Sequence, residues 1–137
     1  MAHSYGFSID LERAKTAASA ALAEARRNSW SMAVAVVDTG GRLVYFEKMD
    51  DTQNGSVDVS VAKARSAALF KRPTKAFQDI LSGGAGGLRV LALEGAVPVE
   101  GGVPLMSGEK VIGAIGVSGG TSEEDGRCAE AGAKTLG

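Results

Sequence analysis

Histidine and cysteine are almost missing from this chain, and their scarcity limits the chemistry it can support. The 137 residues contain one cysteine, Cys128, and one histidine, His3. A single cysteine excludes an internal disulfide and cannot build a thiolate zinc cluster alone. A Ser-His or Cys-His nucleophile system would have to use His3, close to the N-terminus. The sequence therefore predicts no metal site and does not favour a hydrolase of the catalytic-triad type.

An excess of charge of either sign is also missing. Lys and Arg number 15 against 16 Asp and Glu, so the net charge is −1. Nucleic acids and anionic membranes attract basic surfaces, and we expect neither as a partner. The first ten residues lack the pattern of a secretory signal, and the longest run of small apolar residues, 16–25, is too short to span a bilayer. We expect one domain, residues 1–137, in the cytoplasm.

Proline is rare as well, with three residues, whereas glycine is abundant, with 19. The glycines gather in pairs between apolar runs, at 40–41, 83–87, 101–102 and 119–120. This distribution indicates turns and close backbone approaches rather than a disordered linker.

The apolar pattern predicts alternating groups of helices and strands. We expect a helix after Asp10 to about residue 28, a hairpin of strands 32–38 and 43–49, and helices over 56–70 and 73–81. Residues 83–87 are expected to form a flexible connection, and 88–93 fit a short helix or an extended segment. Strands follow within 96–106, with an edge position favoured by two prolines, and over 111–119.

The strand over 111–119 is followed directly by a helix. Along that strand Ile112, Ala114, Gly116 and Ser118 are expected to share one face, which would be nearly bare of side chains at its end. Thr121 and Glu124 form a capping box for the last helix, and Glu123 and Asp125 complement its dipole. The element order predicts an α+β fold with an antiparallel sheet between helices.

Three stretches together resemble one known family. They are AVAVVDTGGRLVYFEKMDD, AKARSAALFKRPTKAF and PVEGGVPLMSGEKVIGAIGVSGGTSEEDGRCAEAG, which in this order are similar to the GlcG/HbpS family of haem-degrading-type domains. The C-terminal domain of PduO-type corrinoid adenosyltransferases belongs to the same group. The resemblance extends from about residue 9 to residue 136. It implies a profilin-like three-layer α/β/α fold with a five-stranded antiparallel sheet, and a homo-oligomer.

The resemblance also implies haem as a possible ligand, since some members bind it. Haem iron is usually held by His, Cys, Tyr or Met. Here His3 is interpreted as a solvated terminal residue and Cys128 as a small buried hydrophobe. Tyr45, Met49 and Met106 fit packing in strands or loops.

A second possible site consists of polar groups near the glycine turns. Lys63, Arg65 and Arg72 fit a solvated face. Alternatively, Lys63 or Arg72 points into a pocket bordered by Glu100 and by Gly101, Gly102, Ser118 and Gly119. Such a pocket could hold a small carboxylate or phosphate, with Glu100 as a base.

The turn at 118–120 is itself a poor anion site. Three carboxylates follow it, and the capping box uses the N–H groups that an anion would need.

Three functions remain open at this stage. The first is a small-ligand-binding accessory protein, with haem or a related tetrapyrrole as candidate ligand. The second is a small catabolic enzyme that acts on an organic acid or its carbonyl derivative through Lys63, Arg72 or Glu100. The third is an oligomerisation module without a ligand.

Overall fold

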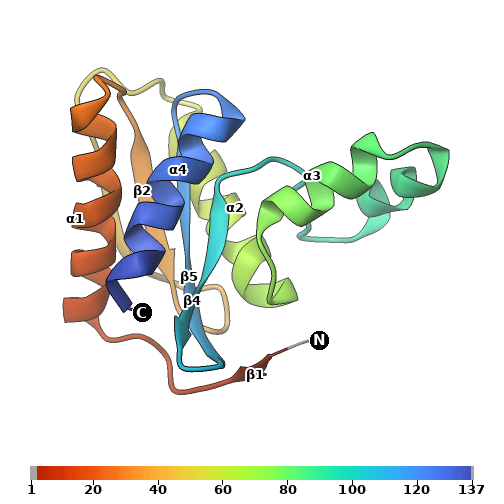
Figure 1. Ribbon diagram of the computed structural model, residues 1–137, viewed down its shortest axis with the longest axis horizontal. Helices are drawn as coiled ribbons and strands as arrows, with labels where there is room; N and C mark the ends of the chain where they lie inside the picture. The colour runs from red at the N-terminus through yellow and green to blue at the C-terminus, as the bar shows by residue number, and fades with distance from the viewer. Residues whose placement is uncertain (1–2, 137) are drawn as a thin grey trace.

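The computed structural model describes residues 3–136, which form a sheet between helices and an arm that projects from one end (Figure 1). The elements in chain order are β1 (Ser4–Tyr5), α1 (Leu11–Arg27), β2 (Ala33–Val37), β3 (Leu43–Lys48), α2 (Ser56–Phe70), α3 (Thr74–Ser82), the 3₁₀ helix η1 (Ala85–Ala92), β4 (Gly102–Ser107), β5 (Lys110–Ser118), α4 (Ser122–Ala133) and the 3₁₀ helix η2 (Lys134–Leu136).

The sheet is mixed, so the expectation of a purely antiparallel sheet was wrong. Strand β5 pairs with β2 and β4 in antiparallel fashion, and β2 pairs with β3 in the same way. The exception is β1, whose two residues run parallel to the start of β5. A parallel neighbour needs a long connection, and the chain provides it through nearly the whole domain. Strand β4 is at an edge among these pairings, in agreement with Pro104 within it, whereas Pro98 precedes the strand in residues without regular structure.

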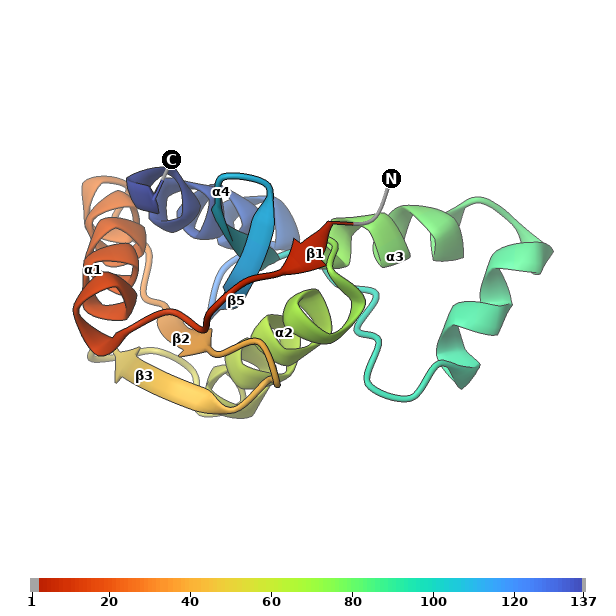
Figure 2. The same ribbon diagram turned by 90° about the horizontal axis from the view of Figure 1, so that it is seen from below.

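Helices cover both faces of the sheet. Figure 2 shows α1 and α4 side by side on one face and α2 on the other. The five residues of β2 are fully buried, as a strand covered on both faces should be. Small residues line the interior contacts of the helices, which lets their axes lie close to the sheet: α1 buries alanines at 14, 17, 18, 21 and 25.

One register shift changes the predicted faces of β5. Leu105 of β4 pairs with Gly113 of β5, but the next residue, Met106, pairs with Val111. Ile112 is therefore an extra residue on β5 without a partner on β4. Ile112 therefore packs in the core on the α1 and α4 side with Ile115, and not with Ala114 beneath α2. A bulge inserts one residue and reverses the alternation of a strand.

The segment after α3 is ordered rather than a flexible connection. Residues 85–92 form η1, which packs against α3, and the two elements make up the arm seen in Figures 1 and 2.

Candidate functional site

A buried ion pair joins the two helical layers across the end of β5. Lys63 on α2 is 1% exposed, and its Nζ lies 2.9 Å from Oδ2 of Asp125 on α4. The same Nζ donates to the carbonyl oxygen of Val117, at 3.0 Å. Lys63 is thus part of the interior and not of a solvated face. Because its ammonium has hydrogen-bond partners within the protein, its charge is compensated there.

The partner of Lys63 was missed by sequence reasoning. Asp125 was assigned to the helix dipole, but its carboxylate is buried and its Oδ1 accepts a hydrogen bond from the N–H of Gly120, at 2.9 Å. Burial raises the pKa of Asp125, while the bonds from Lys63 and Gly120 act in the opposite direction. The sequence offered one signal for this pair. Asp125 is the fourth residue of a helix that begins only four residues after the end of β5, so its side chain could be expected close to that strand end.

The glycine pair Gly101–Gly102 packs against Lys63, Gly101 against its ammonium and Gly102 against its backbone. Gly101 has a φ of +136°, and a Cβ built on it would lie 2.7 Å from Lys63 Nζ. Its carbonyl oxygen accepts from the N–H of Val117, at 2.9 Å, and the N–H of Gly102 donates to Thr74 Oγ1, at 2.9 Å. The pair is therefore a backbone wall that no larger residue could form.

A cavity of about 290 Å³ opens on the outer side of this wall, and we call it the Glu100 pocket. Its lining combines Gly101 and Gly102 with residues in or directly before α3, β4 and α4: Pro73, Lys75, Ala76, Asp79, Glu100, Val103, Gly126 and Glu130. Lys75 is paired with Asp79, at 3.0 Å, so the pocket carries a net negative charge from Glu100 and Glu130.

Glu100 and Glu130 are the two carboxylates of this pocket without an ion pair among residues 3–136. The carboxylate of Glu100 has no hydrogen bond or ion pair among residues 3–136, although its backbone N–H donates to Gln78 Oε1, at 2.8 Å. A Cβ on Gly126 would overlap this carboxylate, so Glu100 lies in the space that the glycine leaves on α4. Desolvation by burial raises the pKa of Glu100, which is the direction that favours proton transfer near neutral pH.

Of the remaining predicted site residues, Ser118 and Gly119 lie at the end of β5, whereas Arg72 lies elsewhere on the surface. Ser118 lies at the end of β5 with its Oγ 3.1 Å from Ser56 Oγ, so its hydroxyl already has a partner on α2. Gly119 is next to it, against the backbone of Ser31. Arg72 lies apart: it is exposed, its guanidinium stacks over Phe77, and it lines neither of the cavities described here.

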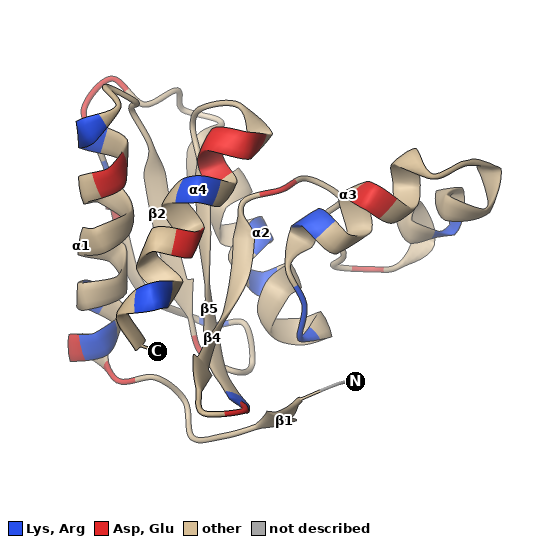
Figure 3. Ribbon diagram, viewed as in Figure 1, with Lys and Arg blue, Asp and Glu red and all other residues tan. Residues whose placement is uncertain are grey.

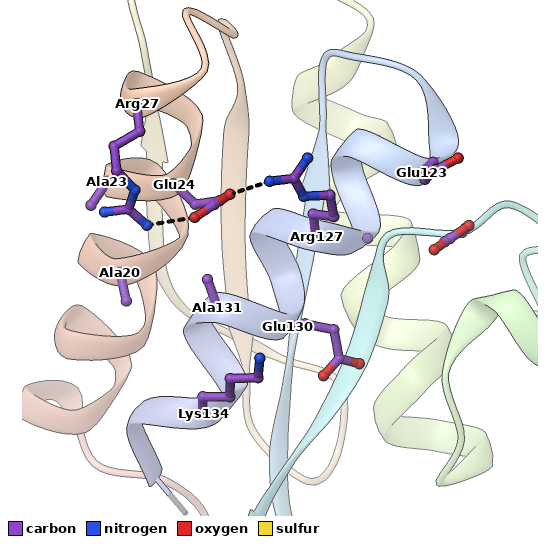
Figure 4. A pocket seen from close by; sticks show the side chains of 11 residues that line it. Ala20, Ala23, Glu24, Arg27, Glu123, Arg127, Glu130, Ala131 and Lys134 are labelled. Atoms are coloured by element: carbon purple, nitrogen blue, oxygen red, sulfur yellow. Dashed lines mark hydrogen bonds and ion pairs between the residues drawn. The ribbon is translucent and has the colours of Figure 1, made fainter.

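A larger groove of about 670 Å³ runs between α1 and α4, and we call it the helix groove (Figure 4). It meets the Glu100 pocket, because Glu100, Gly126 and Glu130 line both. The small residues of its lining are Ala20, Ala23, Gly126 and Ala131. Its charged residues are Glu24, Arg27, Glu100, Glu123, Arg127, Glu130 and Lys134. No sequence signal pointed to this groove, because its two walls are 100 residues apart in the chain.

An ion network crosses one end of the helix groove. Glu24 of α1 accepts hydrogen bonds from Arg27 and from Arg127 of α4, the latter at 2.9 Å, and Figure 4 shows the two arginines on either side of it. The hydrogen bond from Arg27 is the main cause of a lowered pKa of Glu24. Arg127 also lies over the ring of Trp30, at 5.2 Å. The network links the two helices, although its arginines are largely exposed to solvent.

The candidate iron ligands lie away from both cavities. Cys128 is buried, and burial raises the pKa of its thiol to about 12, so it is the inert hydrophobe expected. Tyr45 and Met49 pack against the core, and Tyr45 donates to Glu47 at 2.6 Å. His3 and Met106 line neither cavity.

Over residues 3–136 we find no group of three or more His, Cys, Asp or Glu side chains arranged to hold a metal ion. In the same range, every helix is too short or too polar to cross a membrane. Figure 3 shows acidic and basic residues interspersed along α1 and α4.

Comparison with known proteins identifies a family and several related structures. Residues 9–134 match the family model described as haem degrading protein HbpS-like. The Protein GlcG of Escherichia coli K12 is 37% identical over 99 residues, which are 69% of either chain. The crystal structure of the Klebsiella pneumoniae protein ORFY has a TM-score of 0.86 at 32% identity and covers 99% of this chain and 96% of its own. A structure of PduOC in complex with haem has a TM-score of 0.83 at 25% identity, with coverages of 94% and 95%.

Proposed function

The chain belongs to the family of haem-degrading HbpS-like proteins, and from this we propose that it is a ligand-binding accessory protein that binds haem or a related tetrapyrrole and acts as a homo-oligomer. The complex of its structural neighbour PduOC with haem supports this class of ligand. We assign the binding to the helix groove, since the Glu100 pocket is less than half as large.

The observation that carries the proposal is that the helix groove combines a floor of small residues with a rim of charged side chains. Alanine and glycine side chains leave a shallow surface on which a flat macrocycle can lie. The lining has four glutamates against three cations, Arg27, Arg127 and Lys134, so the carboxylates of a tetrapyrrole would have to bind at these cations individually. An arginine that already binds Glu24 retains further N–H donors for this purpose.

The lining of the groove fits the macrocycle and its carboxylates better than it fits the iron. Among the described residues that line it, there is no His, Cys, Tyr or Met to serve as an axial ligand. When bound, haem would supply its redox-active iron, and this chain would supply the floor and the paired cations. We therefore expect protoporphyrin IX, which has no iron, to compete with haemin at similar affinity.

Titration of the protein with haemin and with protoporphyrin IX, followed by absorbance, tests this assignment. We expect saturable binding of both, weakened at least tenfold in Ala23→Phe, which fills the groove, and in Lys134→Ala. Matched controls are Ser19→Phe and Lys15→Ala, because both residues are exposed on α1 and line neither cavity. Binding that is unsaturable, or that the groove variants do not weaken, would contradict the proposal.

A second function is supported by Glu100. A half-buried carboxylate with a raised pKa, no ion-pair partner and a small cavity in front of it is suited to act as a general base. The net negative charge of the pocket favours a neutral carbonyl compound over an ionised organic acid. In such a reaction the Glu100 carboxylate would take a proton from the carbon next to the carbonyl, leaving an enolate. Solvent would then reprotonate that carbon, and Glu100 would return its proton to solvent.

Exchange of the carbon-bound protons of hydroxyacetone in D₂O, followed by NMR, measures this activity. If the pocket is catalytic, Glu100→Gln should slow the enzyme-dependent exchange by about 10²-fold or more. Arg72→Ala is the control, because Arg72 lines neither cavity. Exchange at the solvent rate with the wild-type protein would exclude this activity on that compound class.

A further inference from the structure

The arm is a small packed unit of its own. Helix η1 makes its extensive contacts with α3. They are close: Gly87 is buried, and a Cβ built on it would overlap the carbonyl oxygen of Ile80. Val90 is buried beside it on η1. The arm therefore holds its shape by internal packing, while the body of the domain leaves its outer side uncovered (Figures 1 and 2).

The outer side of η1 presents leucines to solvent. Residues three apart share a face in a 3₁₀ helix, so Gly87 and Val90 form the inner face and Leu88 and Leu91 form another. Leu88 is 56% exposed and Leu91 66% exposed. Two exposed leucines on one face of a projecting element are an apolar surface that an assembly could bury.

The charges beside these leucines suit a second copy of the same surface. Arg89 precedes Leu91 by two residues and Glu94 follows it by three, and both are exposed. Neither side chain has an ion-pair partner among residues 3–136. A two-fold axis close to Leu91 and perpendicular to η1 would run the two copies antiparallel. Arg89, at the flank of the leucine face, would then approach Glu94 of the other copy, which follows the end of η1. A surface with a positive charge on one side of an apolar centre and a negative charge on the other is complementary to a second copy of itself.

We propose that Leu88, Arg89, Leu91 and Glu94, which we call the arm patch, form an interface in which two copies of this chain associate arm to arm around a two-fold axis. The proposal extends the self-association included in the proposed function by naming its surface. It is independent of the ligand, because none of these residues lines the helix groove or the Glu100 pocket.

The molar mass in solution tests the apolar part of the interface. We expect light scattering to give a wild-type mass of at least two chains, and Leu88→Ser/Leu91→Ser to halve it at the same protein concentration. Leu43→Ser is the matched control, because Leu43 is 53% exposed on β3 of the body. A monomeric wild type, or a double variant that keeps the wild-type mass, would overturn the proposal.

Reversal of the charges tests the two-fold arrangement. Arg89→Glu and Glu94→Arg should each place like charges opposite one another and weaken association at least tenfold. The combination of both substitutions exchanges the two signs and should restore it. Failure of the combined variant to recover would overturn the arm-to-arm geometry.

Haemin titration of the arm variants separates this inference from the proposed function. We expect Arg89→Glu to bind haemin like the wild type while its mass falls. If the mass is unaffected and binding persists, the arm interface is wrong and the ligand proposal stands. If haemin never binds but the arm variants dissociate, the interface stands alone.

Discussion

At the scale of single residues, the Lys63–Asp125 pair determines how the end of β5 is built. The ammonium and the carboxylate are both almost fully buried, and each also bonds to the backbone, at Val117 and Gly120. A buried pair of this kind contributes little compared with an apolar pair of equal volume, but loss of one partner leaves an uncompensated charge. The pair thus links α2, β5 and α4 directly.

Removal of the ammonium alone should be strongly destabilising. We expect Lys63→Met to lower the free energy of unfolding by about 3–5 kcal/mol in urea titrations, because Asp125 stays buried without its cation. The folded-state pKa of Asp125, already raised, should rise further, so the loss is smallest at acid pH and grows as the pH increases.

The exposed pair Lys75–Asp79 provides the control for this variant. Lys75→Met should cost no more than about 1 kcal/mol, because solvent screens the pair. In the double variant Lys63→Met/Asp125→Leu we expect most of the stability to return. A loss as small as that of Lys75→Met would contradict the buried-pair interpretation.

The thiol of Cys128 should be unreactive in the folded protein. Burial raises its pKa to about 12 from an ordinary value of 9.0, so almost no thiolate is present at pH 8. An aromatic disulfide reagent should label it in urea and scarcely without urea. Since the folded pKa is the higher one, stability should fall as the pH rises from 9 towards 12, and Cys128→Ala should lack this part of the decline. Rapid labelling of the native protein would contradict the burial.

At the scale of elements, the close contact of α2 with β5 depends on the bare face of that strand. A Cβ built on Gly116 would overlap the carbonyl oxygen of Ser60 and approach the backbone of Ala64. Ala114 and Gly116 therefore let the helix backbone rest on the strand, and this contact brings Lys63 within reach of Val117 and Asp125.

A single methyl group at this contact should be costly. Gly116→Ala forces α2 away from β5, and we expect a loss of about 1–3 kcal/mol in thermal or urea unfolding, as for overpacked cores. Gly55→Ala is the matched control, since nothing lies within 4 Å of its added Cβ and its φ of −60° suits alanine. Equal stability of the two variants would mean that the contact is not as tight as described.

At the scale of the whole molecule, the body and the arm differ in how they are held. The body, which is the part of the domain outside α3 and η1, has a sheet covered by helices on both faces. Helix η1, in contrast, packs mainly against α3 and leaves its outer side free for an interface. The helix groove lies on the body, whereas the Glu100 pocket lies between the body and α3 at the base of the arm. None of the residues of the arm patch lines either cavity, so ligand binding and association occupy different surfaces.

This difference predicts uneven hydrogen exchange. In Leu88→Ser/Leu91→Ser, the amides of η1 should exchange faster than those of β5, because few contacts oppose local opening of the arm. In the associated wild type, the amides of η1 should be slower than in the variant, with β5 unchanged. Mass spectrometry of peptides from 85–92 and 110–118 measures both, and equal protection in the two proteins would contradict the interface.

Much of the fold could be predicted from the sequence, because helix caps and the periodicity of apolar residues are local patterns. Asp10 caps α1 by accepting from the N–H of Arg13, and the capping box of Thr121 and Glu124 begins α4, both as predicted. The bare face at Gly116 and the packing role of Cys128 were also evident, since the periodicity of apolar and small residues decides which faces are buried.

Only the tertiary structure decided the long-range features. It gave Lys63 a partner 62 residues away, set β1 parallel to β5, shifted Ile112 to the other face and built a groove between α1 and α4. None of these has a local signature, because a side chain's sequence neighbours do not reveal which distant element will be packed against it. The sequence determined the elements and their buried faces, and the packing of those faces determined where charges pair and where cavities remain.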